Sequence, residues 1–132
     1  MAEKKNILLV DDDPDFVEAV RVIVESGGYG VRVAYDGKKG LEAALQGKAD
    51  LIVLDVMLTY PSEGYDLAAT LKKNPETAGI PIIMLTGVNR VFEIRSRLEK
   101  SWVEVDGFHT KPPDFGKLIE TIEQQLHPVA VS

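Results

Sequence analysis

Short apolar runs recur along the chain at fairly even spacing and predict five β-strands. The runs lie at residues 7–10, 31–34, 51–54 and 80–85, with a weaker one at 105–109. Between and after them, apolar residues recur with helical spacing at 16–23, 41–45, 67–71, 91–98 and 115–126. This five-fold alternation predicts an α/β protein: a doubly wound parallel sheet with helices on both faces, joined by right-handed crossovers.

Polar residues stand at the carboxyl ends of four predicted strands, where open α/β sheets place their ligand sites. Asp11 and Asp12 follow the first run, Asp55 the third, Thr86 the fourth, and Lys111 the fifth. If the first and third strands are neighbours, three carboxylates converge. Two unit charges about 4 Å apart repel by about 4 kcal/mol at an effective dielectric constant of about 20. A cation is therefore expected, and Mg²⁺ suits hard oxygen ligands with open positions. A lysine and a hydroxyl group beside such a cation are suited to phosphoryl transfer onto an aspartate.

The next two acidic residues have structural explanations. Asp13 precedes Pro14, and this pair is typical of a helix start, so Asp13 is expected to cap the helix. Asp15 would then lie in the first turn, where a carboxylate is favoured by the helix dipole.

Composition and charge indicate the number of domains, the location and the kind of partner. With 132 residues and 45% hydrophobic content, we expect one domain over residues 1–132, with a core at about 6–126 and a short tail at 127–132. The sequence has no cysteine, no signal peptide and no stretch that could span a membrane. These absences favour a cytoplasmic protein. The net charge of -6 opposes direct contact with nucleic acid or membranes, so a protein partner is expected.

Four segments, ILLVDDD, LIVLDVM, IIMLTG and FHTKPPDF, occur in the order and approximate spacing of response-regulator receiver domains. The resemblance covers residues 6–126. It implies a flavodoxin-like fold with five helices and strand order 2-1-3-4-5, acting as a switch in two-component signalling. Because the tail HPVAVS is too short to be an effector domain, we further expect a stand-alone receiver. It would catalyse only its own phosphorylation and dephosphorylation, as a monomer or weak dimer.

The resemblance implies roles for individual residues. Asp55 would accept a phosphoryl group from a histidine kinase or phosphotransfer protein. Mg²⁺ would be bound by Asp12, Asp55 and the backbone carbonyl of Met57, with Asp11 acting through a water molecule. Lys111 would pair with the acyl phosphate. Thr86 and Phe108 would form the switch. The output would be either a downstream protein that docks on the face around the fourth helix, fifth strand and fifth helix, or transfer of the phosphoryl group to a phosphotransfer histidine. No other cofactor is implied.

The sequence departs from the family pattern in the segment DVMLTYPSEG, where Pro61 and Gly64 stand farther from Asp55 than is usual. The separation of Thr86 from Lys111 is also long. Met57 and Val88 are apolar, and our hypothesis is that they slow loss of the phosphoryl group. Phe108 lacks the hydroxyl of a tyrosine.

Two other functions fit parts of the sequence. A receiver-like module that binds partners without phosphorylation is the main alternative. A haloacid-dehalogenase-like phosphatase would use Asp11 and Asp13 as the first half of its DxDx[TV] motif, but Asp15 occupies the Thr/Val position. His109 and His127 are interpreted as surface or strand residues, since no second ligand stands at metal-binding spacing.

Overall fold

The structure is a computed structural model that describes residues 5–47, 49–55, 63–87, 107–111 and 114–126. For Thr86, Phe108 and Lys111 it describes the backbone and not the side chains. Met57, Pro61, Val88 and His127 lie outside the described residues, as does the expected helix at 91–98.

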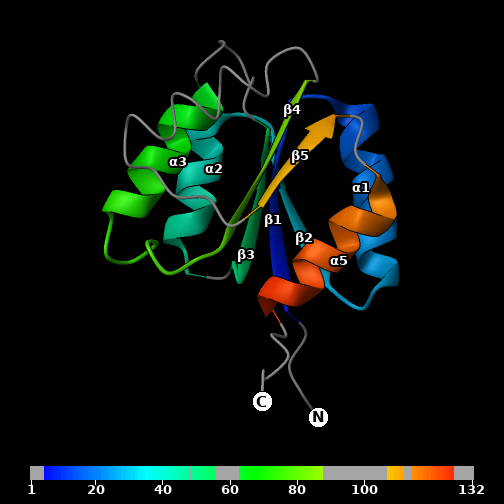
Figure 1. The fold of residues 1–132 in the computed structure, drawn as a ribbon. Coiled ribbons are helices and arrows are strands. Elements are labelled where there is room, and N and C mark those ends of the chain that lie inside the picture. Colours follow the sequence, from blue (N-terminus) through cyan, green and yellow to red (C-terminus); the bar gives the residue numbers. More distant parts are fainter. Residues whose placement is uncertain (1–4, 48, 56–62, 88–106, 112–113, 127–132) are drawn as a thin grey trace, which may run out of the picture.

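Five parallel strands form one sheet in the order β2-β1-β3-β4-β5 (Figure 1). The strands are β1 (Asn6–Val10), β2 (Gly30–Ala34), β3 (Leu51–Asp55), β4 (Ile82–Gly87) and β5 (Gly107–Lys111). The predicted parallel sheet is thus present, and the order implied by the resemblance is confirmed.

The bounds of the last two strands differ from the prediction. The apolar run at 80–85 corresponds to a strand at Ile82–Gly87, and the run at 105–109 to one at Gly107–Lys111. Polar residues extend both strands because their backbones pair, with Thr86 opposite Thr110 and Gly87 opposite Lys111. Thr86 and Lys111 therefore lie within the ends of their strands and do not follow them.

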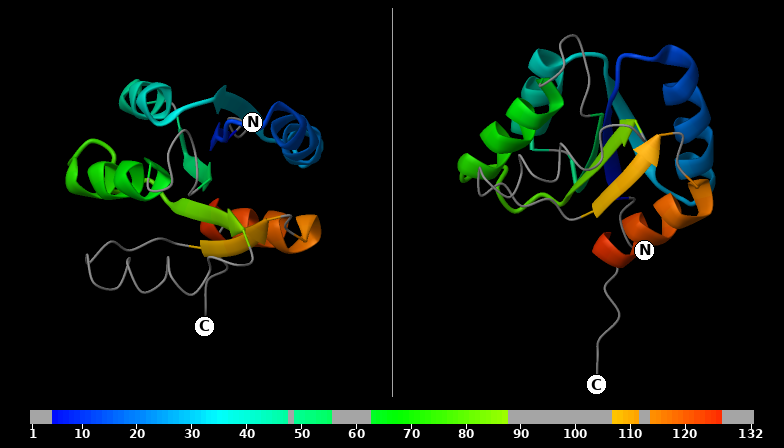
Figure 2. Two further views of the ribbon diagram at one scale, coloured as in Figure 1. Left: turned by 90° about the horizontal axis from the view of Figure 1, so that it is seen from above. Right: turned by 45° about the horizontal axis from the view of Figure 1, so that its top comes forward.

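Helices cover both faces of the sheet (Figure 2). Helices α1 (Pro14–Ser26) and α5 (Phe115–Leu126) lie on one face, and α2 (Gly37–Leu45) and α3 (Glu63–Lys73) on the other. These four helices coincide with four of the five stretches of helical spacing. Helix α1 begins as expected, because the side chain of Asp13 accepts hydrogen bonds from the backbone N–H groups of Asp15 and Phe16.

Each face of the sheet has its own hydrophobic core, because successive strand residues point to opposite sides. In β1, Leu8 and Val10 pack with α2 and α3, whereas Ile7 and Leu9 pack with α1 and α5. The five residues of β3 are buried. Burial on both faces explains why the central strands read as continuous apolar runs and not as alternating ones.

Gly107 lets α5 approach β5 closely. A Cβ atom added at Gly107 would lie 2.9 Å from Cγ2 of Thr121 and 3.3 Å from Cγ1 of Ile83. Real Cβ atoms are essentially never found at the shorter distance, so a larger residue at 107 requires Thr121 or its surroundings to shift.

We therefore expect Gly107→Ala to lower the free energy of unfolding by about 1–3 kcal/mol, the usual cost of overpacking. Urea denaturation would measure the change. Gly79→Ala is the control, because a Cβ there meets nothing within 4 Å. Adding Thr121→Ser to Gly107→Ala removes the clashing methyl group and should recover part of the loss. Equal stability of the two single variants would contradict the close approach.

Candidate functional site

The parallel pairing of β1 and β3 brings two aspartates to one edge of the sheet. Val10 pairs with Leu54, so Asp11 and Asp55 follow at the same level at the carboxyl ends of the two strands. Both are buried, with exposed fractions of 0% for Asp11 and 5% for Asp55. The sheet therefore places two carboxylates where the apolar core ends.

Asp12 completes a cluster of three carboxylates. One oxygen from each of Asp11, Asp12 and Asp55 can be chosen so that all three lie within 4.8 Å of one another. Asp12 is exposed, whereas the other two are buried. The convergence expected from the sequence is therefore present, and one side of the cluster is open to solvent.

The backbone on either side of Asp11 is held by two hydrogen bonds. The N–H of Asp11 donates to the carbonyl of Ala34 over 3.1 Å, which continues the pairing of β1 with β2. The N–H of Asp13 donates to Oδ1 of Asp11 over 2.9 Å. This second bond ties the buried carboxylate to the residue that caps α1. This hydrogen bond was not predicted from the sequence, although an aspartate that accepts from the backbone N–H two residues on is a common turn.

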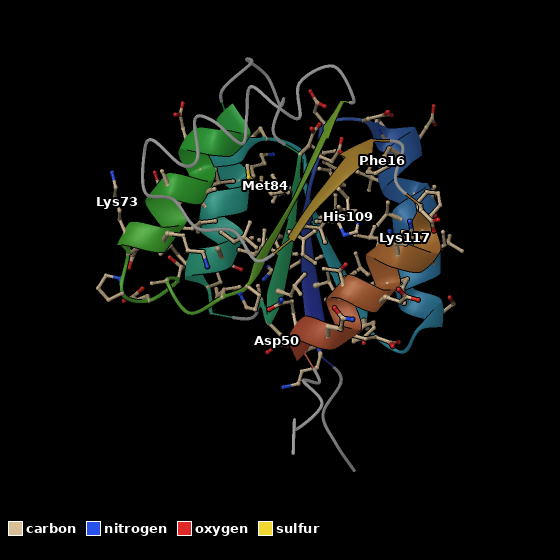
Figure 3. All side chains as sticks on the ribbon, viewed as in Figure 1. Phe16, Asp50, Lys73, Met84, His109 and Lys117 are labelled. Carbon is tan, nitrogen blue, oxygen red and sulfur yellow. The ribbon has the colours of Figure 1, made fainter. Side chains whose placement is uncertain are left out.

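The cluster has the chemistry of a site for a small divalent cation. Three carboxylates so close together repel one another when ionised, and a cation among their oxygens offsets that repulsion. Mg²⁺ prefers hard oxygen ligands, is commonly bound by one or two carboxylates and keeps several waters, which an exposed side of the cluster would allow. The donor set therefore fits Mg²⁺. Asp50, by contrast, lies at the opposite edge of the sheet, where its Oδ2 accepts from the N–H of Asn6 over 2.7 Å (Figure 3).

The backbones of Thr86 and Lys111 lie at the same edge of the sheet as the acidic cluster. Leu85 pairs with Asp55, so Thr86 is one residue beyond the level of Asp55 on the neighbouring strand. Lys111 is the last residue of β5, and Phe108 lies near its start. Thr86 and Lys111 are therefore at the carboxyl ends of β4 and β5, whereas the carbonyl of Met57 lies outside the described residues.

His109 lies inside β5 and is half-buried against α5 (Figure 3). Its Nε2 is 2.9 Å from Oγ1 of Thr121. Burial lowers the pKa of the imidazole below the ordinary value of 6.5, while nearby Asp114 opposes this effect and Lys117 adds to it. The interpretation of His109 as a strand residue is thus correct, but its partner on α5 was not foreseen.

The fold and the acidic edge together define a doubly wound α/β protein with a carboxylate site at the strand ends. A family model for the response regulator receiver domain matches residues 7–123. The chain belongs to this family, and the resemblance noted in the sequence is confirmed. Receiver domains of two-component systems are signalling proteins, so the chain is assigned to that class.

Two curated relatives illustrate the family. The chain is 34% identical over 120 residues to the DNA-binding dual master transcriptional regulator RpaA of a Synechocystis species, covering 91% of this chain and 48% of RpaA. It is 32% identical over 120 residues to the response regulator ArlR of Staphylococcus saprophyticus, covering 91% of this chain and 51% of ArlR. The chain thus spans about half the length of the curated relatives it matches.

Two solved structures are similar in both fold and sequence. A CheY-like response regulator receiver domain protein from Methanospirillum hungatei gives a TM-score of 0.82 at 28% identity, covering 94% of each chain. The signal receiver domain of a histidine kinase from Syntrophus aciditrophicus gives 0.83 at 29% identity, covering 97% of this chain and 94% of that one.

Two of the expectations from the sequence concerned nucleic acid and membranes. The name of RpaA describes a DNA-binding protein, which conflicts with the expectation of no nucleic-acid contact, so that expectation is not carried further. As for membranes, none of the helices in the described ranges is both long and apolar enough to cross a bilayer.

The three-carboxylate cluster should make stability depend on Mg²⁺. A ligand that binds only the folded state at about 100 times its Kd raises the free energy of unfolding by about 2.7 kcal/mol. We expect Mg²⁺ to raise the melting temperature of the wild type and to do so much less for Asp12→Asn. Asp15→Asn, which removes an exposed carboxylate from the first turn of α1, is the control and should respond like the wild type. An equal response of all three proteins would argue against this binding site.

Proposed function

We propose that the chain is a phosphoacceptor switch in which Asp55 receives a phosphoryl group from a histidine kinase or a phosphotransfer protein. The observation that carries the proposal is the cluster of Asp11, Asp12 and Asp55, whose oxygens lie within 4.8 Å of one another at the carboxyl edge of the sheet. In a member of the receiver family, such a cluster at the strand ends supports phosphoryl chemistry and Mg²⁺ binding.

In the proposed reaction, a carboxylate oxygen of Asp55 attacks the phosphorus of a phosphohistidine. A P–O bond forms while the P–N bond breaks, and the imidazole of the donor leaves with the bonding electrons and takes up a proton. Mg²⁺ bound there would offset the negative charge of the phosphoryl oxygens and of the carboxylates. Asp12 and Asp55 would hold the ion with the carbonyl of Met57, and Asp11 would act through a water.

Lys111 and Thr86 would complete the site from the neighbouring strands. Lys111 would supply a positive charge to the acyl phosphate, and the Thr86 hydroxyl would donate a hydrogen bond to it. Their backbone positions at the ends of β5 and β4 support these roles. Phe108, three residues before Lys111 on β5, would change its packing when Thr86 moves.

A phosphoryl group on Asp55 can act as a switch only if it contacts two arrangements of the protein unequally. The new dianion would favour the arrangement in which Thr86 and Lys111 approach it. A downstream protein would read that arrangement on the face that includes β5 and α5. We propose that residues 6–126 form one domain for this purpose, which is supported by the single sheet that all the described strands join.

Incubation with acetyl phosphate and Mg²⁺ should add one phosphoryl group to the folded wild type, observed by intact-protein mass spectrometry. Asp55→Asn should abolish the adduct because it removes the nucleophilic oxygen. Asp50→Asn, the same change at the opposite edge of the sheet, should leave the adduct intact. Omission of Mg²⁺ should reduce its yield strongly.

An adduct that persists in Asp55→Asn would place the modification on another residue and refute the assignment. A folded wild type that forms no adduct with either acetyl phosphate or a phosphorylated histidine donor would favour a module that binds its partners without phosphorylation.

A further inference from the structure

Thr121 of α5 contacts β5 at two residues of the strand. Its Cγ2 fits against Gly107, where a Cβ would come within 2.9 Å. Its Oγ1 is 2.9 Å from Nε2 of His109, two residues farther along the strand. One short side chain thus fixes the helix to the strand through both a steric contact and a polar one.

The direction of the polar contact follows from the partners of Thr121. Its hydroxyl is 3.0 Å from the carbonyl of Lys117, to which it donates its only proton. Its oxygen is then the acceptor toward His109, so Nε2 of the imidazole carries a proton and donates. These partners assign the proton of neutral His109 to Nε2 and not to Nδ1.

Protonation of His109 would bring a positive charge into the contact between α5 and β5. On the strand side, the residue paired with His109 is the apolar Leu85 of β4. On the helix side, the nearby charged groups are Asp114 and Lys117. Asp114 is exposed, and its Oδ1 accepts from the backbone N–H of Lys117 at the start of α5, so it already stabilises the helix end. Lys117 repels a second positive charge.

We propose that His109 is a pH-sensitive positioning residue: its Nε2–H holds α5 against β5 through Thr121 and so sets the placement of the strand end that carries Lys111. Protonation at Nδ1 keeps this hydrogen bond but adds a half-buried positive charge that Lys117 repels, and this charge loosens the packing of α5 on β5. The importance of that placement for phosphoryl transfer rests on the function proposed above. The link between α5 and β5 is independent of that proposed function.

The sign of the pH effect on stability follows from burial. Because the pKa of His109 is lowered in the folded protein, the folded state binds a proton less readily than the unfolded state does. The contribution of His109 to the free energy of unfolding is therefore complete well above pH 6.5 and decreases as the pH falls below 6.5.

The test is a pH titration by NMR of protein with isotope-labelled histidine and backbone amides, without any phosphodonor. In the wild type, we expect the ring nitrogen signals of His109 to report the proton on Nε2 and a midpoint below 6.5. The amide signal of Lys111 should shift with the same midpoint, because the end of the strand follows the protonation of His109.

Two variants separate titration from packing. Glutamine can place an amide N–H near the position of Nε2 but does not titrate, so His109→Gln should retain the contact with Thr121 and lose the Lys111 shift. Thr121→Val keeps the shape of the side chain and removes the acceptor. It should give His109 a mixture of the two neutral tautomers and weaken the response of Lys111. Chemical-shift dispersion of the remaining amides verifies that both variants are folded.

The proposal is overturned if His109 titrates at or above 6.5, if the Lys111 shift persists in His109→Gln, or if Thr121→Val leaves the tautomer unchanged. Repeating the titration in Asp55→Asn keeps the two proposals apart. The Nε2 tautomer and the Lys111 shift are expected there as well, so a protein that forms no aspartyl phosphate still gives a decisive result for His109.

Discussion

The parallel pairing of β1 with β3 is the constraint on which the rest of the structure depends. It aligns the ends of two buried strands, so Asp11 and Asp55 meet at one edge of the sheet. Each buried Leu, Ile or Val side chain contributes about 1.5–3 kcal/mol. The four apolar residues of β3, all with an exposed fraction of 0%, therefore outweigh a carboxylate repulsion of about 4 kcal/mol. The core forces the acidic cluster together, and the cluster in turn favours a cation.

Features with a local cause could be predicted from the sequence, and features with a distant cause could not. The cap at Asp13 and the positions of four helices follow from residues within a few positions of one another. The ends of β4 and β5 were predicted wrongly because Thr86 and Lys111 are polar. They belong to the strands only because Thr86 pairs with Thr110 and Lys111 pairs with Gly87. The strand order came from the family resemblance, since periodicity alone does not say which strands lie side by side.

His109 shows the same limit at the level of one side chain. Its partner Thr121 is twelve residues away on another element, and no motif marks the pair. The spacing of apolar residues correctly predicted both the strand and the helix, yet it carries no information about which polar side chains meet between them. Gly107 is a partial signal, because a glycine inside a strand often marks a close approach of another chain segment.

The position of β5 explains why its contact with α5 matters for the acidic edge. Among the described strands, β5 is the last in the sheet and pairs with β4 alone. Within that pairing, Thr86 faces Thr110 and Gly87 faces Lys111, so the ends of the two strands are joined by one ladder of hydrogen bonds. A displacement of Lys111 is therefore transmitted to the level of Thr86. Because α5 packs on β5 through Gly107 and His109, the helix restrains the same displacement from the other end of the strand. A charge added at the carboxyl edge of the sheet and a change in the packing of α5 on β5 thus act on the same short strand. Each of these changes can therefore influence the other.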